Sequence, residues 1–115
     1  FLRPDEIDVP LDFQSLATVG ATFGSGAIMV MDDTADLNGV LYRLARFFKD
    51  ESCGKCFPCQ LGTQRQFEII KDPKGFQNPL GLIRELGATM RDASICGLGQ
   101  TASSAILSAI DKELV

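Results

Sequence analysis

Four cysteines, spaced C-x2-C-x2-C-x36-C, constrain the fold of this sequence more than any other feature. Three of them lie in the run DESCGKCFPCQLGT, at Cys53, Cys56 and Cys59, and Cys96 follows after 36 intervening residues. The chain has 115 residues, of which 45% are apolar and 23% charged, as is ordinary for one small globular domain or a domain with a tail. We therefore expect a fold that brings a distant thiol to a tight loop of three.

Three kinds of site compete to explain this spacing. A cubane 4Fe–4S cluster takes one thiolate at each of four corners, and a loop with two-residue gaps can wrap three of them while the fourth ligand comes from elsewhere. Structural zinc sites usually use two separate C-x2–4-C pairs, whereas these ligands divide three and one, and the chain has no His. A thioredoxin-like redox pair at Cys56 and Cys59 would leave two cysteines unexplained and lacks its βαβ context. The spacing favours the cluster, with zinc and the redox pair as alternatives.

The residues beside the cysteines also suit a cluster. Gly54, Gly97 and Gly99 allow backbone N–H groups to approach sulfur closely, and Pro58 stiffens the loop. A helix that starts near Cys59 would direct the positive end of its dipole toward an anionic group. These neighbours support the same interpretation as the spacing.

From Asp36 onward the apolar residues recur with helical period. Asp36 is predicted to cap a first helix, Pro73 and Gly75 to end a second, and Asn78 with Pro79 to start a third. We therefore expect a mostly α protein, in which residues 36–115 form a small four-helix bundle that carries the iron–sulfur site. The expected helices begin after Asp36, at or just before Cys59 (ending near Lys71), at Pro79, and at about Thr101 (ending near Glu113).

Residues 1–35 have a different character. The stretch Ala27–Met31 is small and β-prone and follows a glycine-rich turn signal, so a short β segment is expected before the bundle. Ile28 and Val30 would pack it on the bundle or against a second copy. The run FQSLATVG suits one short helical turn. Residues 1–36 carry one base and seven acids, net −6, while the remainder is net +2.

Charge and hydropathy argue against several classes of function. The chain has a net charge of −4 and no Lys/Arg cluster of the kind that binds phosphate backbones, so we expect no nucleic-acid binding. No apolar run approaches the roughly 20 residues that span a bilayer. The start FLRPDEIDVP has neither an initiator Met nor a signal-peptide pattern, so we expect a piece of a longer cytoplasmic protein. Clustered cysteines in that compartment indicate metal binding or catalysis rather than disulfides.

The two cysteine motifs resemble a known family. DESCGKCFPCQLGT together with DASICGLGQTA resembles the C-terminal cluster domain of the NADH-binding, flavin-carrying subunit of respiratory complex I. Diaphorase subunits of NAD-dependent formate dehydrogenases and hydrogenases share this domain, and MRDASICGLGQTA is most similar to theirs. VPLDFQSL and GSGAIMVM are similar to the end of the preceding soluble-ligand-binding β-grasp domain. The resemblance assigns residues 1–35 to the end of that domain and residues 36–115 to the cluster-binding domain.

The resemblance implies one 4Fe–4S cluster held by Cys53, Cys56, Cys59 and Cys96. The cluster would relay single electrons between FMN and further iron–sulfur centres. FMN and NAD would be bound by the upstream part of the full protein, so this stretch would not be catalytic by itself. The implied partners are a 2Fe–2S thioredoxin-like subunit and an iron–sulfur-rich catalytic subunit of a multi-subunit oxidoreductase. The alternative function is a zinc-stapled structural or interaction bundle without a redox role.

Overall fold

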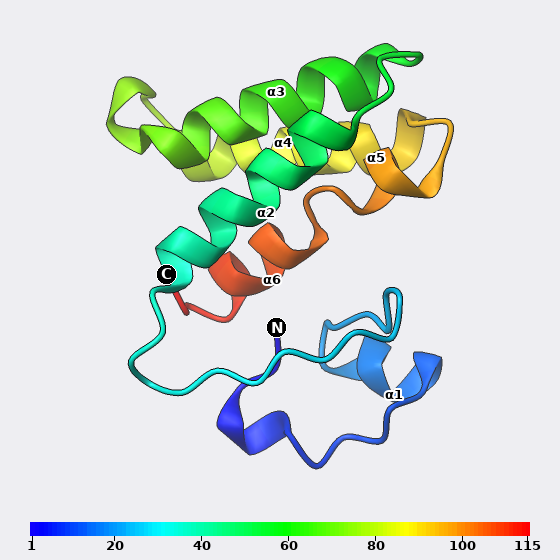
Figure 1. Cartoon of the computed structure of the whole chain (residues 1–115), viewed down its shortest axis with the longest axis vertical. Coiled ribbons are helices and arrows are strands. Elements are labelled where there is room, and N and C mark those ends of the chain that lie inside the picture. The colour runs from blue at the N-terminus through cyan, green and yellow to red at the C-terminus, as the bar shows by residue number, and fades with distance from the viewer. The chain divides into compact units, whose positions relative to one another are not determined.

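The computed structural model describes residues 1–115, and its regular elements are all helices (Figure 1). The expected mostly α fold class is confirmed. The chain divides into two compact units, Phe1–Ala35 and Asp36–Val115. The assignment of these units to a β-grasp remnant and a cluster-binding domain stays a prediction. No helix has the length and apolar content that crossing a membrane requires.

The N-terminal unit contains a 3-10 turn, Pro4–Glu6, and the short helix α1, Phe13–Thr18. The helical turn expected in FQSLATVG is thus confirmed, and its Leu16 is the unit's only buried side chain. The β segment expected at Ala27–Met31 is absent, which corrects that part of the fold prediction. A strand needs a neighbour whose backbone completes its hydrogen-bond ladder, and no segment of residues 1–115 supplies one. Ile28 and Val30 are 68% and 92% exposed.

The helices of the second unit begin where their capping residues predict. Asp36 precedes α2, Leu37–Glu51, and accepts a hydrogen bond from the Gly39 N–H at 3.0 Å. Asn78 precedes α4, Pro79–Ala93, and accepts from the Gly81 N–H at 3.1 Å. Both predicted caps are confirmed. Between them lies α3, Phe57–Lys71, which starts two residues before Cys59 and is followed by the 3-10 turn Pro73–Gly75.

The core of the second unit lies between its helices. The helix α3 packs against α2, α4 and α5 (Gly97–Thr101), while α6 (Ser104–Asp111) packs on α2 and α4 (Figure 1). Burying one Leu, Ile or Met side chain stabilises a fold by about 1.5–3 kcal/mol, so these contacts dominate the unit's stability. The buried apolar side chains are Leu41, Ala45, Cys59, Ile69, Ile83, Met90, Ala102, Ile106 and Ala109.

The last expected helix is interrupted. Instead of one helix from about Thr101 to Glu113, the chain forms α5 and α6 with a break at Ala102 and Ser103. Gln66 of α3 is fully buried beside this break: its Nε2 donates to the Ala102 carbonyl at 3.0 Å, and its Oε1 accepts from the Ser103 hydroxyl. One buried amide therefore bonds to both residues of the break, and it links α3 to the junction of α5 and α6.

Candidate iron–sulfur site

Three of the four cysteines lie at helix starts. Cys56 immediately precedes α3, Cys59 lies in the first turn of α3, and Cys96 immediately precedes α5; Cys53 lies in the loop between α2 and α3. Cys59 is buried, Cys56 is half-buried, and Cys53 and Cys96 are exposed. The N–H groups of a first helical turn have no partner inside the helix and carry partial positive charge. Two such ends, on helices that pack together, favour an anionic group at the cysteines.

Gly99 allows α5 to approach the first turn of α3. A Cβ added to Gly99 would lie 2.9 Å from the Cβ of Cys59 and would also meet the side chain of Ser94. Atoms do not tolerate such a contact, so only glycine fits here. Because Gly99 lies three residues after Cys96, this close approach brings the start of α5 toward Cys59.

The loop that carries Cys53 depends on a second glycine. Gly54 has φ of +73°, the left-handed conformation that residues with a Cβ rarely adopt. Ser52, the residue that directly follows α2, lies with its Oγ 3.3 Å from the Cys59 Sγ. The turn at Gly54 and the contact from Ser52 thus fold the loop back beside the first turn of α3.

The donor set suits an iron–sulfur cluster. All four cysteines are free thiols, and thiolate is the ligand that iron–sulfur clusters require. No three His, Cys, Asp or Glu side chains are grouped in a geometry that could hold a single metal ion. Since metal binding itself supplies free energy that assembles such sites, convergence of all four cysteines on one cluster stays a prediction.

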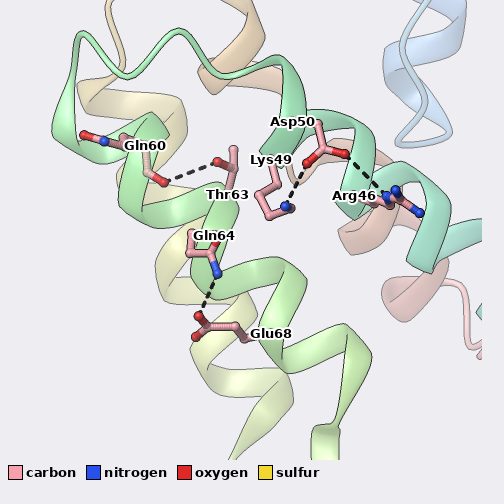
Figure 2. Close-up of polar contacts among 7 residues, drawn as sticks. All are labelled: Arg46, Lys49, Asp50, Gln60, Thr63, Gln64 and Glu68. Atoms are coloured by element: carbon pink, nitrogen blue, oxygen red, sulfur yellow. Dashed lines mark hydrogen bonds and ion pairs between the residues drawn. The ribbon is translucent and has the colours of Figure 1, made fainter.

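Three charged residues near the end of α2 form ion pairs with one another. Figure 2 shows Lys49 and Arg46 both directed at the Asp50 carboxylate, with Nζ at 2.7 Å and Nε at 3.4 Å. The hydrogen bond from Lys49, helped by the charges of Lys49 and Arg46, holds the pKa of Asp50 below its ordinary value despite some desolvation. Asp50 is therefore ionised and forms ion pairs with both Lys49 and Arg46.

An open pocket of about 480 Å³ adjoins the exposed side of Cys53. On the adjoining surface of α3, Gln64 donates to Glu68 at 2.8 Å (Figure 2). The pocket leaves Cys53 accessible from solvent. Its lining residues are Lys49, Ser52, Cys53, Gly54, Gln60, Leu61 and Gln64.

Comparison with known proteins decides the family. The family model described as the NADH-ubiquinone oxidoreductase-F iron–sulfur binding region matches residues 39–112, which include all four cysteines. The chain belongs to this family. Its members are defined by an iron–sulfur binding region, so the suspected family is confirmed and a 4Fe–4S cluster is the cofactor it indicates.

The relatives are subunits of multi-subunit oxidoreductases. The NADP-reducing hydrogenase subunit HndC of Solidesulfovibrio fructosivorans is 38% identical over 96% of this chain and 23% of its own length. The F subunit of NADH-quinone oxidoreductase from Rickettsia akari is 37% identical over 84% of this chain and 23% of its own. The corresponding F subunit from Mycobacterium tuberculosis is 30% identical over 95% of this chain and 25% of its own length. The chain thus spans about a quarter of the length of the curated relatives it matches.

Sequence reasoning missed Ser52, Ser94 and Gln66. The sequence did contain a signal for Gln66. The buried residues of α3 follow helical spacing from Cys59, and this spacing places Thr63 and Gln66 on the buried face of the helix. A buried polar side chain needs a partner inside the fold, and the partners of Gln66 are Ala102 and Ser103, at the break between α5 and α6. Ser52 and Ser94 lie one and two residues before a cysteine in the sequence, but their orientation depends on how α2 and α4 end.

Proposed function

We propose that this chain is the electron-transfer module of an NADH-oxidising or NAD-reducing flavoprotein subunit. Its 4Fe–4S cluster, bound by Cys53, Cys56, Cys59 and Cys96, would relay single electrons between FMN and further iron–sulfur centres. When bound, such a cluster accepts and releases one electron at a time. The observation that carries the proposal is the placement of three of these cysteines at two packed helix starts, in a family defined by iron–sulfur binding.

The chain's own residues bind the cluster and set its surroundings. Cys59 is anchored in the core, whereas Cys53 and Cys96 are exposed, so the site has a buried side and a surface side. Exposed apolar side chains adjoin the surface side, with Phe57 75% and Ile95 78% exposed. This arrangement supports a relay, because a redox partner can approach the site closely from solvent.

The wider assembly is part of the same proposal. FMN and NAD would bind to parts of the full protein that lie upstream of these residues. The partners would be a 2Fe–2S thioredoxin-like subunit and an iron–sulfur-rich catalytic subunit, as in a hydrogenase, a formate dehydrogenase or complex I. The identities of 38% to a hydrogenase subunit and 37% to an NADH-quinone oxidoreductase F subunit support either a hydrogenase-type or a complex I-type parent.

Anaerobic reconstitution tests the proposal. The chain is incubated with iron and sulfide, desalted, and analysed for iron, acid-labile sulfide and zinc. We expect about four irons and four sulfides per chain and a brown protein whose visible absorbance bleaches on reduction. A colourless protein that binds one zinc and no sulfide would establish the zinc-stapled alternative instead.

A further inference from the structure

Ser52 makes a direct contact with one predicted cluster ligand. Its Oγ lies 3.3 Å from the Cys59 Sγ, and in the free thiol form either atom can be the donor. A cysteine bound to iron is a thiolate and has no proton to give. Once Cys59 is a ligand, the direction of the bond is therefore fixed, and Ser52 donates to sulfur.

Ser94 approaches the same cysteine from another helix. It directly follows α4, the residue is 7% exposed, and its Oγ is buried without a hydrogen-bond partner. Its side chain and that of Cys59 meet the same face of Gly99, where an added Cβ would contact both. Buried hydroxyls in native proteins are almost always paired, so this unpaired donor at the cysteine site requires an acceptor.

We propose that the hydroxyls of Ser52 and Ser94 donate hydrogen bonds to sulfur atoms at the Cys59 corner of the cluster and raise its reduction potential. The inference rests on the proposed function, since it presupposes a cluster on Cys59. Reduction adds one negative charge to the cluster, and donors aimed at sulfur stabilise that added charge. The two serines are thus tuning residues that act through hydrogen bonds and not as iron ligands.

An EPR-monitored redox titration of the cluster-loaded full chain tests the proposal. The variants are Ser52→Ala, Ser94→Ala and the double variant, with Ser108→Ala as a matched control. Ser108 is a buried serine on α6, a helix that packs on α2 and α4. We expect each hydroxyl removed to disfavour reduction about threefold to tenfold, roughly 30–60 mV toward negative potential for a one-electron couple. The double variant should shift further, and Ser108→Ala should not shift.

Midpoint potentials equal to wild type in both single variants would overturn the proposal while leaving the cluster itself established. A wild-type chain that takes up no iron and sulfide would instead refute the proposed function, so the two failures are distinct. If the Ser52→Ala variant does not take up a cluster, the isosteric variants Ser52→Thr and Ser52→Val test whether the hydroxyl is needed. Loading and a wild-type potential only with threonine would support the hydroxyl, and equal behaviour of the two variants would refute it.

Discussion

The two units of the chain differ in the reach of the hydrogen bonds that organise them. In residues 1–35, the Ser15 N–H and hydroxyl donate to Asp12, and the Thr34 N–H and hydroxyl donate to Asp32. These bonds join residues two or three positions apart. In residues 36–115, Gln66 bonds to Ala102, 36 positions away, within a core of buried aliphatic side chains. The second unit thus combines local bonds with the distant bonds of Gln66 to Ala102 and Ser103.

This contrast explains why an iron–sulfur site can be built in the second unit. A cluster needs ligands from distant parts of the chain at fixed positions, and only long-range packing fixes them. In this protein Cys59 lies in the first turn of α3 and Cys56 immediately precedes that helix. Gln66 of the same helix bonds to Ala102, which follows α5, and Cys96 immediately precedes α5. The following predictions test this contrast.

Loss of Cys96 should have the largest effect. Cys96→Ala removes the one thiolate supplied from outside the loop, so the 4Fe–4S content after reconstitution should fall to near zero or to a three-iron form. Iron and sulfide analysis with EPR of the oxidised protein measures this. In the full protein, NADH oxidation by an artificial dye should persist, because that reaction needs only the upstream flavin, and electron delivery to the partner should fall sharply.

The control for this prediction is Ser108→Ala, which leaves all four thiols in place and should load normally. Normal loading and normal delivery to the partner by the Cys96→Ala protein would show that Cys96 is not a ligand. The distant thiol would then have no part in the site.

Gln66→Met should have the largest effect on folding stability. Methionine keeps a similar volume but neither donates to the Ala102 carbonyl nor accepts from Ser103, so two buried polar groups lose their partner. Each loss costs about 1–3 kcal/mol, and we expect a decrease of about 2–4 kcal/mol in the free energy of unfolding. Urea denaturation followed by circular dichroism measures it.

Gln64→Met is the matched control for this substitution. Gln64 lies on the exposed face of the same helix and bonds only to Glu68, four residues on. Its replacement should change the free energy of unfolding by less than about 0.5 kcal/mol. Equal denaturation midpoints for the two variants would show that the bond from Gln66 to Ala102 does not stabilise the second unit more than an exposed local bond does.

The same contrast determines what the sequence could predict. The caps at Asp36 and Asn78 are local signals and placed two helix starts correctly, as FQSLATVG placed α1. The break after α5 was not predictable from its own residues, because Gln66 on another helix satisfies it. The expected strand at Ala27–Met31 is absent for the same reason. Its β-prone composition is a local property, whereas a strand also needs a second, distant strand to pair with. The cysteine spacing indicated the family, whereas the serines around Cys59 required the structure.

Gly62→Ala should destabilise the second unit moderately. A Cβ at Gly62 would lie 2.5 Å from Cγ and 2.6 Å from Sδ of Met90, which is 1% exposed and has little room to move. Overpacking costs about 1–3 kcal/mol, while replacing glycine in a helix returns roughly 0.5–1 kcal/mol. We expect a net loss of about 0.5–2 kcal/mol in the free energy of unfolding.

A double-mutant cycle with Met90→Ala isolates the clash in Gly62→Ala. The added methyl group should partly fill the space that the shortened side chain leaves, so the double variant should lose less stability than the two single variants combined. Additive losses would show that α3 and α4 adjust to the extra methyl without strain. The packing of α3 on α4 would then restrict the second unit less than the contrast between the two units implies.

Asp12→Ala should have the smallest effect, confined to the first unit. Hydrogen bonds from the Ser15 N–H and then its hydroxyl hold the pKa of the Asp12 carboxyl below its ordinary value. Because the folded pKa is depressed, the stabilisation of α1 is present above the unfolded pKa and is lost as pH falls through the folded pKa. The Ser15 amide resonance should therefore shift with acidification in the wild-type protein and not in the variant.

Asp32 provides the internal control for that titration. The hydroxyl and the N–H of Thr34 donate to it and lower its pKa in the same way, so the Thr34 amide should titrate in both proteins. Amides near the buried Gln66 should not follow either carboxyl, because each bond spans only two or three residues. A Thr34 titration that disappears in Asp12→Ala would show that the two turns depend on each other, and the first unit would then have longer-range order than its bonds indicate.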